Sequence, residues 1–489
     1  MIRHFIFAIA LFACAPAFAA AKIDQAGADA LKPRVADSLA SVAASFSQSG
    51  ITMQQTGTLL VEPAGDYYAV TTPNITLTLP NGVTRTVGMV AINAIPTDNA
   101  DVFKVAVALP TPMIDTKDGK TVGALEIGTQ SMNGIWNLAA LAFLQLDADY
   151  KNIRQNDQTR NALTTVPELT IDTKLTPNGA LYSGPLEMVF TGMSRTEPKL
   201  SWSAATIRAR IMLHDVDLKI ANDAKKAVAG GDAANINAAM IAYFTKAIDR
   251  ADIFLDEQDV RYKTTNADGT TAERTFKTLT ARASLAKIKS GLADGKMNVT
   301  VEGIATSDPQ QVQFTPTRAN FNGTIERFPV AGFFAAADRT AMESAFNDAK
   351  TRVVFENSVM EAPAYHMSMN ADVSAKSKLG VGKYHLEVRG IDQLIAHLNS
   401  PQGAHALGLG GGAVTNLVPL LAVVQLTGQG AKDAQGRDIR TYDLVLKDDG
   451  RIILNGNDLT AIASTLQQAA NGAKAQGPLA PVIVAPPKK

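Results

Sequence analysis

The sequence predicts an α+β fold rich in β-structure: an extended, curved antiparallel sheet built from repeated helix-plus-strand units, with helices covering one face. Three observations predict it. A glycine-bounded, alternating ten-residue phrase recurs from Gly184, Gly295 and Gly382. Turn dipeptides such as Asn81-Gly82 separate alternating runs, as is typical of β-hairpins. Helical segments return about every hundred residues, which is a repeat signal.

The recurring phrase reads GPLEMVFTGM, GKMNVTVEGI and GKYHLEVRGI. Apolar residues at every second position are typical of a strand with one buried face. Each copy opens with glycine and closes with glycine followed by Met or Ile, and these glycines are Gly184, Gly192, Gly295, Gly303, Gly382 and Gly390. Glycine shapes the backbone and carries no reactive group. The phrase therefore indicates architecture and not chemistry.

The helices are expected to begin near residues 34, 137, 235 and 339. The first starts at Pro33, ends before Gly50 and buries Val35, Leu39, Val42 and Phe46. The others cover about 137–144, 233–250 and 339–350, and shorter C-terminal helices cover 392–398, 414–426 and the residues from 459. Strands are expected at 58–61, 75–79, 103–107, 144–153, 169–175, 253–262, 279–285, 353–355, 367–373, 442–447 and 451–454, besides the three phrases.

These segments predict four regions. Residues 1–19 are a signal peptide, 20–335 a repeated β-rich region, 336–470 a C-terminal α+β region and 471–489 a disordered tail. Gly, Ala, Pro and Lys dominate the tail, which is a composition that buries little apolar surface.

The N-terminus has the layout of a secretory signal. Arg3 precedes an apolar run, Pro16 interrupts it, and Ala17-Phe18-Ala19 has the small-residue pattern of a cleavage site. Cleavage between Ala19 and Ala20 is expected, with cleavage after Ala21 as the near alternative and an uncleaved anchor as another. Export to the periplasm follows, with no transmembrane span in the mature chain.

The single cysteine, Cys14, lies within this segment. One interpretation is a lipid-modified thiol, and the other is an ordinary residue of the apolar run. The bulky Phe12 and the apolar residues after Cys14 favour the second. The mature chain would then fold without a disulfide.

Composition excludes one class of partner. The chain carries 46 basic and 46 acidic residues, so no excess positive charge attracts nucleic acid.

The strongest metal candidate is His214-Asp215-Val216-Asp217, because imidazole and carboxylate are suitable ligands for zinc or manganese. In a strand, however, neighbouring residues point to opposite faces. Only Asp215 and Asp217 would share a face, so a solvated strand is the better interpretation. Of the remaining mature histidines, His366 and His385 are expected to face water, and neither His397 nor His405 has ligand spacing.

Other motifs fail on spacing or context. Gly119-Lys120-Thr121 lacks the earlier glycine of a phosphate-binding loop, and Gly408, Gly410, Gly411 and Gly412 follow no strand. Ser284 and Lys287 have S-x-x-K spacing but lie in an alternating run. Asn266, Asp268 and Gly269 lack the first acidic residue and final Glu of a calcium loop. No catalytic, metal or cofactor-binding residue is assigned.

The C-terminal stretch YDLVLKDDGRIILNGNDL, from Tyr442, predicts a strand, a turn, a second strand and a helix. It resembles the close of uncharacterised bacterial envelope families of the YdgA and AsmA groups, and GIDQLIAHL after the third phrase is similar in style. The resemblance covers about the last hundred residues and implies a β-rich periplasmic protein with a long repetitive sheet. It carries over no catalytic residue. AsmA-type proteins keep an N-terminal anchor, whereas this signal has a cleavage site.

The expected function is that of a non-enzymatic periplasmic envelope protein that binds lipid or another apolar ligand in a groove of the sheet. One alternative is a scaffold that binds another envelope protein. A less favoured alternative is a metal-dependent hydrolase built around His214, Asp215 and Asp217.

Overall fold

The computed structural model describes residues 23–47, 50–99, 101–138, 140–221, 223, 241, 243–265, 269–336, 338–376, 380–398, 427–433 and 435–461. It divides into two units. Unit 1 extends to Ser307 and includes Ile325–Ala349, and unit 2 comprises Asp308–Thr324 and the residues from Lys350 onward. The boundary expected at residue 335 falls inside unit 1.

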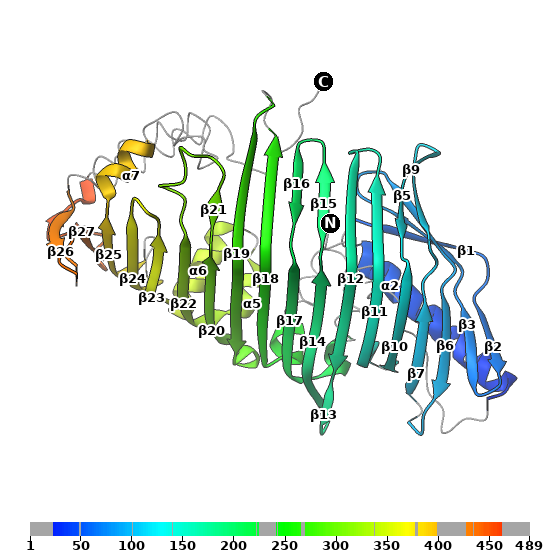
Figure 1. The fold of residues 1–489 in the computed structure, drawn as a ribbon. Helices are drawn as coiled ribbons and strands as arrows, with labels where there is room; N and C mark the ends of the chain where they lie inside the picture. The colour runs from blue at the N-terminus through cyan, green and yellow to red at the C-terminus, as the bar shows by residue number, and fades with distance from the viewer. Residues whose placement is uncertain are drawn as a thin grey trace. The chain divides into compact units, whose positions relative to one another are not determined.

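Strands dominate both units, and the strand pairings among the described residues are antiparallel, which confirms the β-rich antiparallel character (Figure 1). The strands of unit 1 are β1 Thr52–Thr56, β2 Leu60–Ala64, β3 Tyr67–Thr71, β4 Asn74–Thr78, β5 Thr84–Gly88, β6 Ala91–Pro96, β7 Val102–Ala108, β8 Met113–Lys117, β9 Lys120–Glu126, β10 Thr129–Asn137, β11 Ala142–Asp157, β12 Ala162–Lys174, β13 Thr176–Asn178, β14 Leu181–Thr191, β15 Ser194–Glu197, β16 Leu200–Ser203, β17 Thr206–Val216, β18 Arg250–Thr265, β19 Thr271–Ala286, β20 Leu292–Glu302 and β21 Ala305–Thr306.

The sheet of unit 1 branches at β11. One part of this long strand pairs with β10 and leads through β7, β6 and β3 to β2. The other part pairs with β9 and leads through β8, β5 and β4 to β1. From β11 onward the order is β12, β14, β17, β18, β19 and β20. Both branches and the helix α2 supply buried residues to one hydrophobic core.

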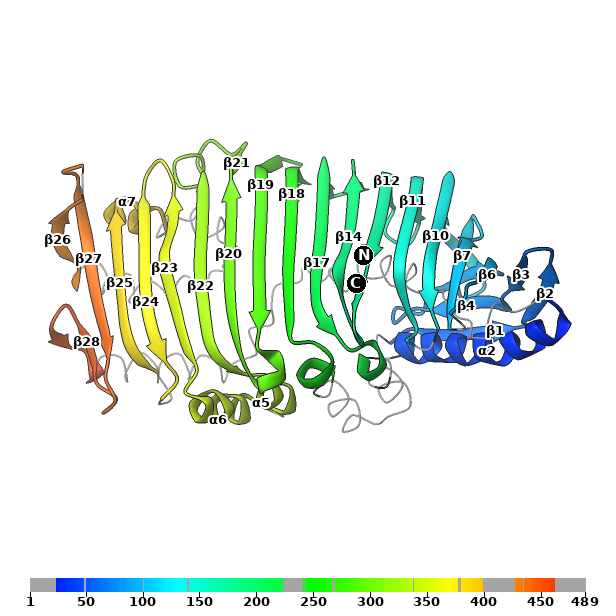
Figure 2. The same ribbon diagram turned by 90° about the horizontal axis from the view of Figure 1, so that it is seen from below.

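The helix α2, Gln25–Ser47, lies against β1 and β2 (Figure 2). Val35, Leu39 and Phe46 are buried, which confirms the expected apolar face. The expected start at Pro33 is wrong, since Pro33 lies inside the helix. The helix begins earlier because the carboxylate of Asp24 accepts a hydrogen bond from the backbone N–H of Gly27 (3.0 Å), as an N-cap does.

The helix expected at 137–144 is also wrong. β10 ends at Asn137, a turn follows, and β11 begins at Ala142. The Asn137 side chain accepts a hydrogen bond from the backbone N–H of Ala140 (3.0 Å) and closes that turn. A short apolar run such as Leu138–Leu144 suits a buried strand as well as a helix.

The third helix, expected at 233–250, lies largely outside the described residues. Within it the structure describes a π-helix, Tyr243–Ala247, and Arg250 already belongs to β18. Residues 218–221 are also helical, and further helices described in unit 1 are the 3₁₀-helix Ile288–Ser290, α5 Val330–Ala335 and α6 Arg339–Ala349. α6 confirms the fourth expected helix, but the repeated helix-plus-strand unit and helices covering one face are not confirmed.

Unit 2 contains a smaller antiparallel sheet in the order β23, β24, β25, β27 and β28. Its strands are β23 Arg352–Glu361, β24 His366–Ser374, β25 Val381–Arg389, β26 Gln429–Lys432, β27 Asp438–Leu446, β28 Ile452–Leu454 and β29 Asn457–Asp458; β22, Arg318–Pro329, contributes residues to both units. The helix α7, Ile391–Leu398, buries Ile391 and Ile395 against Val388 and Tyr442. The C-terminal hairpin predicted from the sequence is confirmed by β27 and β28.

The closing glycine of each phrase follows directly after a strand and has a left-handed backbone. The φ angles are 68° at Gly192, 66° at Gly303 and 71° at Gly390. The opening glycines differ, because none of Gly184, Gly295 and Gly382 has a positive φ. A Cβ on Gly184 or Gly382 would clash with a carbonyl oxygen of the neighbouring strand. The three copies thus share a strand and a kink, whereas a repeated module remains a prediction.

In unit 1 such kinks form a line across the sheet. Asn152 on β11 and Asp259 on β18 also have positive φ, at 54° and 49°. The flanking register places these kinks with Gly192 and Gly303 in one transverse line, which continues through Pro167, Ala205 and Lys277. We call it the kink line. The backbone N–H of Gly192 donates to the carbonyl of Ala205 along it (2.8 Å).

The kink line changes the alternation of the strands. Buried residues stand three apart across it, as in Phe190 and Met193 or Ile207 and Ala204. A regular strand would place the second residue of each pair on the opposite face. Met193, which follows the closing glycine of the first phrase, therefore lies on the same face of the sheet as Phe190.

Candidate functional site

One face of the unit 1 sheet carries a continuous row of residues that register places side by side. Directly opposed residues in antiparallel strands point to the same face. The row runs through Tyr68, Ala94, Val105, Gly134, Leu146, Thr173, Leu186, Ile211, Ile253, Ala283 and Met297. We call this face of the sheet the apolar face.

Burial along this row changes abruptly between β12 and β14. Leu146 and Thr173 are 7% and 8% exposed, because the two branches and α2 enclose that part of the face. Leu186, Ile253 and Met297 are 39%, 49% and 47% exposed. The surface that forms the core among the first strands is therefore open to solvent over the later ones.

A second row of apolar residues lies beside the first on the same strands and is half-buried. The two rows together form what we call the open apolar patch, which consists of Leu186, Met188, Ala209, Ile211, Ile253, Leu255, Ala281, Ala283, Met297 and Val299. It crosses five strands, which at about 4.8 Å between neighbours is a span of about 19 Å. Contiguous exposed apolar surface is where folded proteins bind ligands or partners, so the patch is the candidate functional site.

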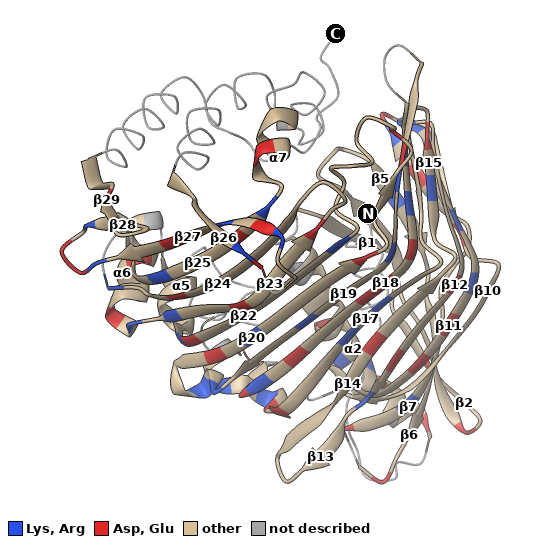
Figure 3. Cartoon of the chain, turned by 60° about the vertical axis from the view of Figure 1, so that its left-hand side comes forward, with Lys and Arg blue, Asp and Glu red and all other residues tan. Residues whose placement is uncertain are grey.

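The opposite face of the same strands carries most of their charged residues by register, and Figure 3 shows where charged residues lie along the strands. Arg208 and Glu187 form an ion pair there (3.2 Å), and Lys296 is exposed beside Met297. Most charged residues of these strands thus lie on the face opposite the patch, which also carries Val189, Met212 and Phe254.

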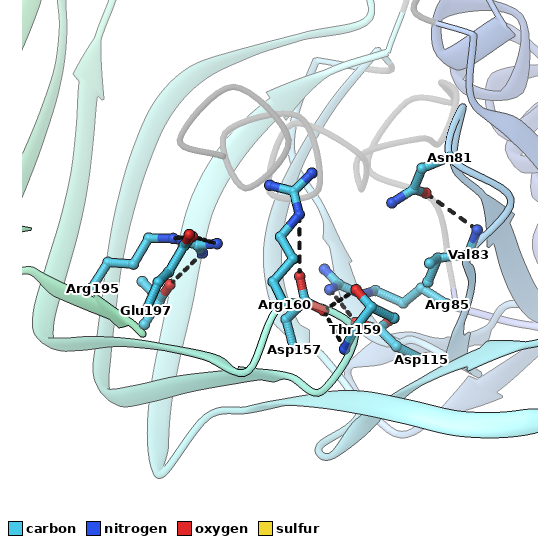
Figure 4. Close-up of polar contacts among 10 residues, drawn as sticks. Asn81, Val83, Arg85, Asp115, Asp157, Thr159, Arg160, Arg195 and Glu197 are labelled. Atoms are coloured by element: carbon cyan, nitrogen blue, oxygen red, sulfur yellow. Dashed lines mark hydrogen bonds and ion pairs between the residues drawn. The ribbon is translucent and has the colours of Figure 1, made fainter. Parts of the chain in front are cut away.

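Polar contacts stabilise the enclosed part of the unit (Figure 4). Arg85 on β5 donates two hydrogen bonds to the carboxylate of Asp115 on β8 (2.7 and 2.8 Å), and both side chains are buried. Arg195 is buried against Glu197 and the Thr164 hydroxyl (3.1 Å to Thr164). Each buried cation therefore has a carboxylate partner, as burial of charge requires.

On the apolar face, the register row next to the patch contains one carboxylate, that of Glu257. Glu257 lies opposite Ile207 and Leu279, on the row that continues to Phe190 and Val301. Burial raises the pKa of its half-buried carboxyl. Sequence reasoning missed this residue, although the alternation of Ile253, Leu255 and Glu257 was the signal that could have found it.

The structure does not bring the predicted metal candidates together. His214 Nε2 lies 2.9 Å from the carboxylate of Asp252. Asp215 has a positive φ of 50° and its carboxylate contacts Ser183 (3.4 Å), while that of Asp217 accepts the backbone N–H of Ile220 (3.0 Å). Within the described ranges, no group of three or more His, Cys, Asp or Glu residues could hold a metal ion.

The other motifs of unit 1 lie in ordinary turns and strands. Gly119 lies in the tight turn between β8 and β9, with a φ of 74°. Ser284 lies within β19, and Lys287 follows that strand with an ion pair to Asp294 (2.7 Å). Lys287 is therefore outside the strand in which it was expected.

Two histidines of unit 2 have carboxylate neighbours. His385 lies between Asp443 (Nδ1, 2.7 Å) and Glu387 (Nε2, 3.3 Å). The Asp443 hydrogen bond raises the pKa of His385, against the opposing effect of burial. His366 Nδ1 lies 3.4 Å from Glu361.

His397 differs, because it stacks on Phe314 with ring centroids 3.7 Å apart and its Nε2 lies 3.2 Å from Gln311. Burial lowers its pKa.

Several predicted segments lie outside the described residues: Cys14, Ala19, Ala20, Asn266, Asp268, His405, the glycines Gly408 to Gly412, the helix at 414–426 and the tail from 471. Gly269, beside two of them, lies in the β18–β19 turn with a φ of 84°.

Comparison of the chain with protein-family models, with curated proteins and with solved structures gives no match. Among the helices that the structure describes, none has the length and apolar character needed to cross a bilayer.

Proposed function

We propose that this chain is a non-enzymatic periplasmic protein of the cell envelope that binds lipid acyl chains on the open apolar patch. The observation that supports it most is the row from Leu146 to Met297, which is buried at one end and exposed at the other. A ligand that covers Leu186, Ile253 and Met297 would extend the core over them. Burial of the exposed half of each side chain would contribute about 1 kcal/mol.

The dimensions of the patch are suitable for an acyl chain. Its span of about 19 Å exceeds the roughly 15 Å that one leaflet of a bilayer core occupies. Its side chains are aliphatic or methionine, and such surface is non-directional in what it binds. Trp, Tyr and Arg, which dominate protein–protein hot spots, are absent from its ten residues, and this favours lipid over an envelope protein partner.

Export belongs to the same proposal. Cleavage between Ala19 and Ala20 would release the mature chain into the periplasm, where lipids pass between membranes. Fractionation of cells and N-terminal sequencing of the mature chain test this part separately.

Lipid binding is tested with the chain from Ala20, purified in denaturant, refolded without lipid and incubated with phospholipid vesicles. Re-isolated protein is expected to carry phospholipid, measured by mass spectrometry. Ile253→Asn combined with Met297→Asn should reduce the bound lipid several-fold by placing amides on the patch. Lys296→Asn, on the opposite face, is the matched control. Wild-type protein that carries no lipid would exclude the proposal, and capture of a protein by the same patch would favour the scaffold alternative.

A further inference from the structure

The open apolar patch is bordered by one acidic side chain. Glu257 occupies the register row next to the patch, and the other members of that row are Phe190, Ile207, Leu279 and Val301. A carboxylate on an apolar face is costly unless something pairs with it.

No described residue pairs with that carboxylate. Its side chain has no hydrogen bond or ion pair among the described residues, and burial alone raises its pKa. Beyond Glu257 along β18, the charged residues that follow in register are Asp259 and Lys277 on the kink line and Arg274 opposite Tyr262. Arg195, further along, is already engaged by Glu197.

Aromatic side chains lie beyond Glu257 on the same side of the patch. Tyr262 and Phe276 have ring centroids 6.5 Å apart, and Trp202 pairs with Tyr262 in register. Tyr262 is 42% exposed, and the charge of Glu257 contributes to raising the pKa of its phenol, after burial. Glu257 and these rings lie on one face of the sheet with Val260 between Glu257 and Tyr262, and a carboxylate and aromatic rings are the groups that bind organic cations.

We propose that the ligand of the open apolar patch is an amphiphile with an ammonium head group, which the carboxylate of Glu257 and the rings of Tyr262 and Phe276 bind. This inference rests on the proposed function and adds the chemistry of the head group. The ammonium group pairs with the carboxylate, and its alkyl tail lies across Leu255, Ile253 and their neighbours. A charge-assisted contact that is partly shielded from water is stronger than a neutral one.

The test compares two single-chain lipids with the same acyl chain, lysophosphatidylethanolamine and lysophosphatidylglycerol, by titration calorimetry with lipid-free protein from Ala20. Both heads contain a phosphate, so the difference reports the ammonium group. Wild-type protein is expected to bind the ethanolamine lipid about tenfold more tightly, which is the usual effect of one hydrogen bond to a charged group. Glu257→Gln should abolish the preference.

Asp256→Asn is the control, because it removes a negative charge from the same strand but from the opposite face. Equal affinity of wild-type protein for both lipids would overturn the inference and leave the proposed function intact. The same holds if Glu257→Gln and Asp256→Asn behave alike. Failure of both lipids to bind would contradict the proposed function itself.

Discussion

Leu146 and Ile253 lie on the same register row of one face of the sheet, separated by β12, β14 and β17. Leu146 is 7% exposed and Ile253 is 49% exposed. The chain thus uses one alternating pattern for two purposes. Where the branches of the sheet and α2 enclose the face, the pattern makes a core, and where they do not, it makes an apolar surface.

Alanine substitutions at Leu146 and Ile253 should differ in their effect on stability, because the first side chain is enclosed in the core and the second is half-exposed. Leu146→Ala removes buried methyl groups and should lower the free energy of unfolding by about 2–5 kcal/mol. Ile253→Ala should lower it by less than about 1 kcal/mol, since half of that side chain is already in water. Urea denaturation of lipid-free protein measures both. Equal losses would show that β18 is covered in solution.

The buried ion pair of Arg85 and Asp115 should be sensitive to removal of either partner. Asp115→Ala leaves the Arg85 guanidinium buried without its two hydrogen bonds, and we expect it to lower the free energy of unfolding by about 3–5 kcal/mol. Arg85→Met combined with Asp115→Leu should recover most of that loss, because neither charge then remains. A double-mutant cycle of Arg85→Met, Asp115→Leu and their combination, measured by thermal denaturation, reports the coupling. Additive single losses would mean that the pair is solvated.

Glu257 gives stability a pH dependence whose sign follows from its raised pKa. A carboxyl with a folded-state pKa above the unfolded value, 4.5, favours the folded state when protonated. The stability that the protonated carboxyl contributes is fully present below the unfolded-state pKa and is lost as pH rises through the folded-state pKa. Glu257→Gln should therefore raise the melting temperature at pH 7 and leave it nearly unchanged at pH 4. If Glu257→Gln changed the melting temperature by the same amount at pH 7 and at pH 4, the burial of the Glu257 carboxyl would be contradicted.

His385 should titrate above its ordinary value of 6.5, because Asp443 accepts a hydrogen bond from its imidazolium. The stability that this pair gives unit 2 is complete below the unfolded pKa and is lost as pH rises through the folded one. Asp443→Asn should lower the pKa of His385, and Glu387→Gln should lower it less. NMR titration of the imidazole measures both. A larger effect of Glu387→Gln would reverse the assigned roles.

The sequence was sufficient where local chemistry decides structure. Asn81-Gly82 predicted the hairpin of β4 and β5, and the alternation of Phe103, Val105 and Val107 predicted a strand with a buried face, because turn type and strand period are local. It failed at 137–144, where tertiary pairing of β10 with β11 prevails over an apolar run that also suits a helix.

The candidate site needed the structure. Alternation predicts that Ile253 and Met297 share an apolar face, but which residues another layer covers depends on contacts far apart in the sequence. The kink line could not be predicted from the sequence either, since two of its positive-φ positions, Asn152 and Asp259, are not glycine. Glu257 was within reach of sequence reasoning, because its parity with Ile253 and Leu255 is visible in the chain.

Lipid binding on the apolar face is tested directly with single cysteines, since the chain from Ala20 contains none. Met297→Cys and Lys296→Cys place an environment-sensitive fluorophore on opposite faces of β20. On addition of phospholipid, emission from residue 297 is predicted to shift to the blue, while emission from residue 296 stays constant. No shift at 297, or an equal shift at both positions, would contradict lipid binding on the apolar face.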